Sequence, residues 1–233
     1  MLPISSMIEQ HAEEACFLIL LHDHAVRAPH YDLDDLSKLD ERIDAHLDGL
    51  RIAGSTGLEI LLAQLGPHAV GETFASVLLA FEAADAKMLS RLSDHLRSAS
   101  ETERGYLMAL GWLDWERVSP WIERMLTSPE PLFRRLGLAA CGMHRHDPGP
   151  ALLAGLSDAD PSVLARAART AGELRRRVLL PAIRAHRQHE DAATRFWANW
   201  ATTQMGDQQA LEPLRSFAEQ PGEFQYRALC VLL

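Results

Sequence analysis

The stretch that decides the fold, residues 156–174, reads LSDADPSVLARAARTAGEL. It opens with an acidic turn, Asp158-Ala159-Asp160-Pro161, and continues into an alanine-rich segment that reaches Gly172. Alanine is the best helix former, because it loses no side-chain entropy when a helix forms. The stretch therefore predicts an acidic turn followed by a helix that ends near the glycine.

The same order of elements recurs from about residue 101 onward. Prolines 30, 31 and 32 residues apart are each predicted to begin an amphipathic helix: Pro120, Pro150, Pro181 and Pro213. A glycine that ends an alanine-rich helix lies seven to nine residues before each proline: Gly111, Gly142, Gly172 and Gly206. Stacked helix pairs of this kind form an α-solenoid, because no single pair can bury its own apolar face. The ankyrin signature is absent, and the tetratricopeptide pattern does not fit.

Residues 156–174 resemble the HEAT-like repeat in its short form, found in phycobilin-lyase-type arrays. They depart from it at one point, because the arginine usual directly after Val163 is displaced to Arg166. The resemblance covers roughly residues 101–233 and implies a helical-repeat fold, but it implies almost nothing about chemistry. The segment 224–233 resembles the first helix of a further, incomplete unit.

Composition points to the same fold class. Leu and Ala supply 70 of the 233 residues, whereas Val and Ile supply 15. This balance favours helices and argues against an all-β or doubly wound architecture. We therefore expect an all-α fold, with an acidic N-terminal helical block over residues 1–100 followed by a short HEAT-like α-solenoid over residues 101–233.

Within the N-terminal block, helices are predicted at residues 5–27, 56–65, 67–82 and 84–98. A further helix is predicted between a cap at Asp32 or Asp34 and an end at Gly54, with an apolar stripe of Leu36, Leu39, Ile43, Leu47 and Leu50. Acidic residues gather on one flank of that helix: Asp34, Glu41, Asp44 and Asp48. Such a flank is either a solvated outer face or a surface that steers a basic partner.

The net charge of −9 lies entirely within residues 1–100. A nucleic-acid binder needs the opposite sign to neutralise phosphates, so direct nucleic-acid binding is not expected. The longest apolar run, residues 15–21, is too short to span a bilayer. Three cysteines at no metal-like spacing are typical of a reducing compartment. We therefore expect a cytoplasmic protein without a membrane partner.

The N-terminal segment carries a narrower resemblance. Its residues 13–18, 27–31, 36–39 and 41–50 resemble the opening of an uncharacterised proteobacterial family with HEAT-like repeats, whose members tend to be encoded near type VI secretion loci. The likeness spans about the first 65 residues. It implies a context, interbacterial toxin delivery, rather than an activity.

No sequence signature of catalysis is present. A nucleophile elbow, a phosphate-cradling glycine loop and a Cys-His signature are all missing, so we expect neither an enzyme nor a cofactor. The pairs His22/His24 and His144/His146 are predicted to be surface histidines, since a zinc site needs further ligands at recognisable spacing. The tryptophans Trp112, Trp115 and Trp121 are either repeat core or an aromatic hot spot for a partner.

These features lead to three hypotheses. The first is an immunity protein that captures and neutralises a cognate type VI secreted toxin, with a nuclease as the candidate toxin. The second is an adaptor that loads an effector onto the secretion apparatus, and the third is a helical-repeat lyase or glycosylase, which the missing motifs disfavour. The predicted partner-binding residues are those of the acidic flank and the three tryptophans: Asp34, Glu41, Asp44, Asp48, Trp112, Trp115 and Trp121.

Overall fold

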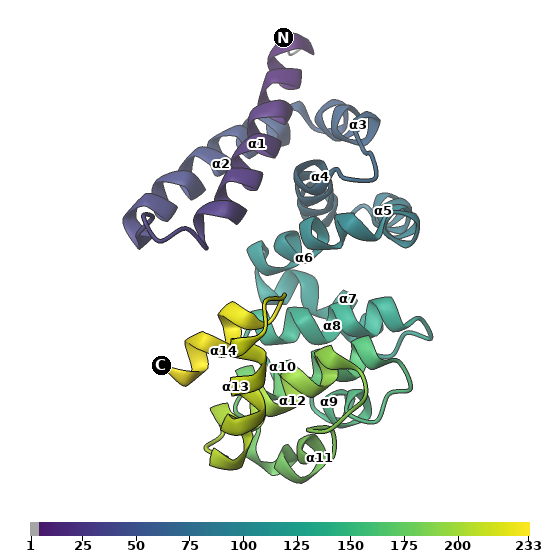
Figure 1. Ribbon diagram of the computed structural model, residues 1–233. Coiled ribbons are helices and arrows are strands. Elements are labelled where there is room, and N and C mark those ends of the chain that lie inside the picture. The colour runs from purple at the N-terminus through teal and green to yellow at the C-terminus, as the bar shows by residue number, and fades with distance from the viewer. Residues whose placement is uncertain (1–4) are drawn as a thin grey trace. The chain divides into compact units, whose positions relative to one another are not determined.

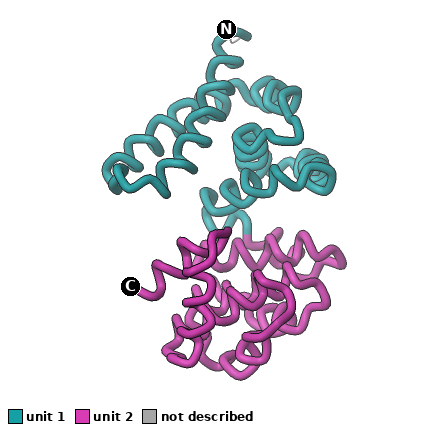
Figure 2. The backbone as a smooth tube through the Cα atoms, in the orientation of Figure 1, with its two compact units in different colours: residues 1–118 teal, residues 119–233 magenta. Residues whose placement is uncertain are grey.

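The computed structural model of the chain describes residues 5–233, and no strand occurs in that range (Figure 1). The predicted all-α fold is confirmed. Contacts between residues divide the chain into two compact units, Met1–Val118 and Ser119–Leu233 (Figure 2). The predicted boundary at residue 100, between the N-terminal block and the repeats, stays a prediction. It separates helices by whether they belong to repeats, whereas the two units are defined by contacts.

Unit 1 is built around one helix that is buried on almost every side. This central helix is α4 (Val70–Glu82), in which ten of thirteen residues are buried. It packs against α1, α3, α5 and α6, while α2 packs chiefly on α1. The helices of this unit are α1 (Ser5–Ala25), α2 (Leu33–Ala53), α3 (Ser55–Ala63), α4, α5 (Ala86–Ser98) and α6 (Glu103–Trp112), with a 3₁₀ turn at Ser100–Thr102.

Helix α2 has the predicted ends. The Asp32 carboxylate accepts a hydrogen bond from the backbone N–H of Asp35 at 2.9 Å, which caps the first turn. Gly54 ends the helix in the left-handed region, with φ of 59°. The predicted stripe faces the core, because Leu36 is half-buried and the other four members are buried: Leu39, Ile43, Leu47 and Leu50.

Unit 2 consists of helix pairs with the predicted proline positions at three of the four sites. Helix α9 begins at Pro150, Pro181 is the second residue of α11, and Pro213 is the third residue of α13. The helices are α8 (Pro131–Met143), α9 (Pro150–Gly155), α10 (Pro161–Glu173), α11 (Leu180–Arg184), α12 (Ala192–Gln204), α13 (Leu211–Glu219) and α14 (Gln225–Leu232), with 3₁₀ turns at Arg177–Leu179 and Gln208–Ala210.

The prediction for Pro120 is wrong. Helix α7 (Trp115–Leu126), which contains the boundary between the units, begins five residues earlier and holds this proline in its interior. The apolar residues Val118, Ile122 and Met125 recur at helical spacing and are all buried. Burial of Val118 therefore extends the helix upstream of the proline, even though proline removes one backbone hydrogen bond.

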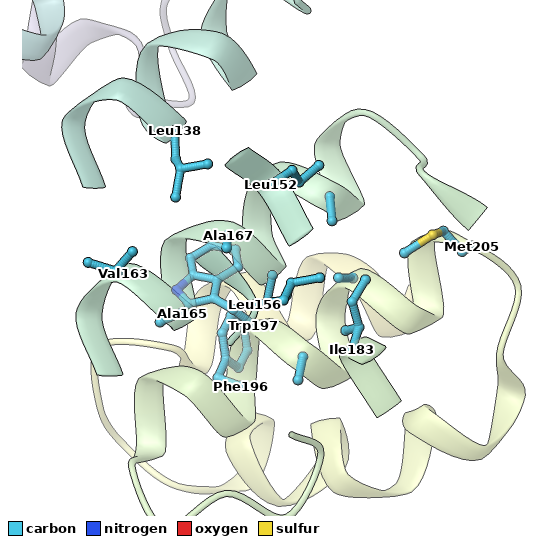
Figure 3. Packing of buried hydrophobic residues seen from close by; sticks show 14 of the residues in the cluster. Leu138, Leu152, Leu156, Val163, Ala165, Ala167, Ile183, Phe196, Trp197 and Met205 are labelled. Atoms are coloured by element: carbon cyan, nitrogen blue, oxygen red, sulfur yellow. The ribbon is translucent and has the colours of Figure 1, made fainter. Parts of the chain in front are cut away.

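The core of unit 2 joins successive helices through one continuous apolar cluster (Figure 3). Phe196 on α12 stacks on Phe224 with ring centroids 4.5 Å apart, and Trp197 meets Phe196 edge to face at 5.0 Å. The final helix α14 packs on α13 and α12, where Val231 and Leu232 lie partly buried against this cluster while Leu229 is exposed. The apolar face of the last helix thus has a covering neighbour.

Polar bridges tie α8, α10 and α12 together within that core. The Thr170 hydroxyl on α10 donates to the Leu138 carbonyl of α8 at 2.9 Å, and the Thr194 hydroxyl on α12 donates to the Pro161 carbonyl at 3.1 Å. Both threonines are fully buried, so these bonds satisfy groups that would otherwise destabilise the fold.

Candidate protein-binding site

The four acidic residues predicted to bind a partner lie together on the solvent side of α2. All of them are exposed: Asp34, Glu41, Asp44 and Asp48. At 100° per residue they occupy an arc of about 80°, whose centre lies about 140° from the centre of the buried stripe. We call this set the acidic face. It is separated from the packing of α2, so its charges can be changed without disturbing the core.

One end of the acidic face is tied to α4 through Arg51. The guanidinium of Arg51 donates to both carboxylate oxygens of Glu82, at 2.8 and 2.9 Å, and to Asp48 at 2.7 Å. These bonds raise the pKa of Arg51, the hydrogen bond to Glu82 contributing most. Asp44 lies 4.0 Å from the same guanidinium. Among the four residues of the acidic face, Asp48 is therefore the one whose charge Arg51 compensates most strongly.

Two members of the acidic face, Asp34 and Glu41, lie outside the contacts of Arg51. In the described part of the chain no ion pair reaches Glu41 or Asp34, because the nearby Lys38 pairs with Asp35 at 3.3 Å instead. Unit 1 as a whole holds 20 acidic and 9 basic residues, whereas unit 2 holds 12 acidic and 14 basic residues. The acidic face thus belongs to a unit with a net charge of −11. A surface of this kind attracts basic partners and repels acidic ones.

The three predicted tryptophans are all half-buried and belong to different units. Trp112 on α6 packs edge to face on Phe74, with ring centroids 5.5 Å apart, and on His22 at 6.0 Å, all within unit 1. Trp115 lies at the start of α7 in the same unit. Trp121 lies in unit 2, where the Arg124 guanidinium is 5.5 Å from its ring centroid. All three side chains are therefore partly packed, and their role as partner contacts stays a prediction.

Sequence reasoning missed a histidine pair between α1 and α2. The Nδ1 atoms of His11 and His46 lie 3.2 Å apart, and the pKa of His46 is lowered by burial and by the neighbouring His11. Spacing could not reveal the pair, because the two residues are 35 positions apart. Across residues 5–233, no three His, Cys, Asp or Glu side chains come together as a metal site. Nor does any described helix have the length and apolarity needed to cross a bilayer.

Comparison with known proteins bears on unit 2. Residues 149–232 match the family described as HEAT repeats, which covers α9 to α14. No curated protein matches the chain. Helical repeats of this class are typically scaffolds for protein–protein interaction rather than enzymes, since their stacked helices present an extended surface. The fold and the match therefore define a helical-repeat protein whose binding surface has to be found on its exposed faces.

Proposed function

We propose that this protein is an immunity protein, which captures and neutralises a secreted toxin through the acidic face of α2. The observation that carries the proposal is the exposed, largely uncompensated charge of that face in a unit of net charge −11. The type VI context rests on the resemblance of the N-terminal segment described above, and Trp112, Trp115 and Trp121 are proposed as further partner contacts.

The toxin that suits such a face has a basic active site. A nuclease meets this requirement, because it must neutralise the phosphates of its substrate with Lys and Arg. An acidic helix placed over those side chains would compete directly with nucleic acid. The proposal therefore predicts that capture and loss of toxicity occur together.

The first experiment asks whether capture and neutralisation occur together. The chain is co-expressed in a bacterial host with the product of the neighbouring gene, and growth and complex formation are both scored. Restored growth with a stable complex supports immunity. A complex without restored growth supports the adaptor hypothesis instead, and the absence of both refutes capture of that product.

The second experiment tests the acidic face itself. Glu41→Lys with Asp44→Lys should slow association on the order of tenfold at low salt and flatten its salt dependence. Each exposed contact contributes only about 0.2–1 kcal/mol, so the effect appears in the on-rate before the affinity. These two positions are chosen because reversing Asp48 would also disturb the contacts of Arg51 with Glu82.

The control carries the same change in net charge at sites away from this face. Glu59 on α3 and Glu123 on α7 are exposed positions inside helices, and both are replaced by Lys. We expect the control to associate at nearly the wild-type rate. Equal slowing by both double variants would mean that net charge alone acts, and an unchanged rate in the acidic-face variant would place the partner elsewhere.

A further inference from the structure

A cleft of about 740 Å³ opens where three alternate helices of unit 2 end. It lies at the carboxyl ends of α8, α10 and α12. Its lining includes two arginines, Arg145 and Arg175, and two large apolar side chains, Trp200 and Met143. Glu173 and Gln204 also line it. We call it the arginine cleft. Nothing in the sequence pattern had marked it, because its residues come from three different repeats.

Both arginines occupy a backbone position that favours glycine. After each of the three helices the chain turns through a left-handed residue, with φ of 52° at Arg145, 50° at Arg175 and 95° at Gly206. The N–H of each of these residues bonds to a carbonyl in the last helical turn, at 3.2, 3.0 and 2.9 Å respectively. The third turn uses glycine, the residue with no steric penalty there. The first two turns keep a bulky side chain in a disfavoured conformation.

The arginines of the cleft have no acidic partner among the described residues, whereas the acids near them are engaged. Glu173 accepts from Arg169 at 2.8 Å and is also bound by Arg166. Burial lowers the pKa of Arg166 to about 10, which still leaves it charged at neutral pH. Asp147, in the turn after α8, pairs with Arg176. Arg145 and Arg175 are exposed, so the cleft presents two uncompensated positive charges.

The helix dipole does not account for this arrangement. Basic residues near a helix carboxyl end are stabilising, but Arg176 and Arg177 in the same turn after α10 already supply that charge without a left-handed backbone. The cleft also depends on glycine beneath it. A Cβ on Gly172 would lie 2.7 Å from the Trp200 ring, so this glycine allows the ring to line the cleft.

We propose that the arginine cleft binds an acidic segment of a protein partner, with Arg145 and Arg175 holding a carboxylate and Trp200 and Met143 contacting the aliphatic stem. Arginine suits this task because its planar fork matches a carboxylate with two parallel hydrogen bonds. A phosphate backbone fits less well, since neutralising its repeated charges needs a run of Lys and Arg, whereas the cleft offers two arginines without an acidic partner. The inference rests on the proposed function only in that the ligand belongs to a protein.

The experiment uses fluorescein-labelled peptides of six glutamates or six glutamines flanked by glycines, with binding to the full chain followed by anisotropy at low salt. We expect the glutamate peptide to bind at least tenfold more tightly. Arg145→Gly with Arg175→Gly should remove that difference, while the melting temperature stays unchanged or rises because glycine relieves the left-handed backbone. Arg145→Glu with Arg175→Glu should abolish glutamate binding as well.

Arg177→Ala is the matched control, since this arginine is exposed and close in sequence but does not line the cleft. It should bind like the wild type. Equal binding of the two peptides, or equal loss in the control, would overturn the inference. Tighter binding of a labelled oligonucleotide that depends on Arg145 and Arg175 would replace the acidic peptide by a phosphate ligand. Because the peptide assay uses no toxin, a negative result in it does not contradict the immunity proposal. Likewise, a failure to restore growth in the co-expression experiment does not contradict peptide binding at the arginine cleft.

Discussion

The single asparagine of the chain gives the sharpest test of how unit 2 is held together. Asn199 on α12 is fully buried, and its amide group donates to the carbonyls of Arg187 and Arg195 at 3.0 and 2.8 Å. Its side-chain oxygen accepts from Nε of Arg187 at 3.1 Å. Two of the three bonds therefore tie the connection between α11 and α12 to the body of α12.

Asn199→Ala should destabilise the protein by about 2–4 kcal/mol. Each lost hydrogen bond contributes roughly 0.5–1.5 kcal/mol, and the Arg187 carbonyl is left without its side-chain donor at a cost of about 1–3 kcal/mol. Arg187→Met removes only one of the same bonds, the one from Nε, because the backbone carbonyl remains. A double-mutant cycle between the two positions should thus report that single charge-assisted bond, about 1.5–3 kcal/mol.

The measurement is urea unfolding of the wild type, both single variants and the double variant. Thr203→Ala is the control, because its hydroxyl bonds only to the Asn199 backbone carbonyl one turn back, at 2.9 Å. We expect the control to lose less than about 0.5 kcal/mol, as exposed or local changes usually do. A loss below about 0.5 kcal/mol for Asn199→Ala, or additive single variants, would refute the bridging role of this side chain.

Three further outcomes are expected. Gly172→Ala should destabilise unit 2 by about 1–3 kcal/mol in thermal unfolding, because its Cβ would lie 2.8 Å from the backbone of α12, which cannot yield cheaply. In a thiol-reagent assay at pH 7.5, the exposed Cys230 should react at once, whereas the buried Cys16 and Cys141 should react only in denaturant. Burial raises the pKa of both buried thiols, that of Cys141 to about 12. Bonding to Arg134 lowers the pKa of Asp158, so its stabilisation is present above the unfolded pKa of about 3.9 and is lost as pH falls below it. The free energy of unfolding of Asp158→Asn, followed by circular dichroism, should therefore fall less than that of the wild type between about pH 5 and pH 2.

The ends and faces of α2 could be predicted because each has a local cause. Asp32 caps the helix with its own carboxylate, Gly54 supplies a left-handed end, and apolar residues at helical spacing face the core. The exposed position of Glu41 and its neighbours follows from the same periodicity. Local chemistry of this kind needs no knowledge of the tertiary fold.

The turns of unit 2 were harder to predict, because close packing and turn geometry both select glycine. Gly142 and Gly172 are predicted to end their helices, and each is the second-last residue of its helix, where it packs closely against α10 or α12 respectively. The left-handed residues after α8 and α10 are instead Arg145 and Arg175, and arginine is a residue type that gives no turn signal. The arginine cleft therefore becomes visible only when the three helix ends are brought together.

The two proposed surfaces carry opposite charge, and salt dependence can separate them. All 14 basic residues of unit 2 are arginines, and most of them bind carboxylates or carbonyls within the unit, as Arg134, Arg184 and Arg187 do. The arginine cleft thus presents two exposed arginines without an acidic partner among the described residues, whereas the acidic face presents exposed carboxylates. Salt screens both contacts, since neither is buried in the free protein. A partner that binds both the acidic face and the arginine cleft should keep part of the salt dependence of its association rate after Glu41 and Asp44 are replaced by Lys. It should lose the remaining salt dependence only when Arg145 and Arg175 are also replaced by glycine. Loss of the whole salt dependence on reversal of the acidic face alone would mean that the captured protein does not reach the cleft.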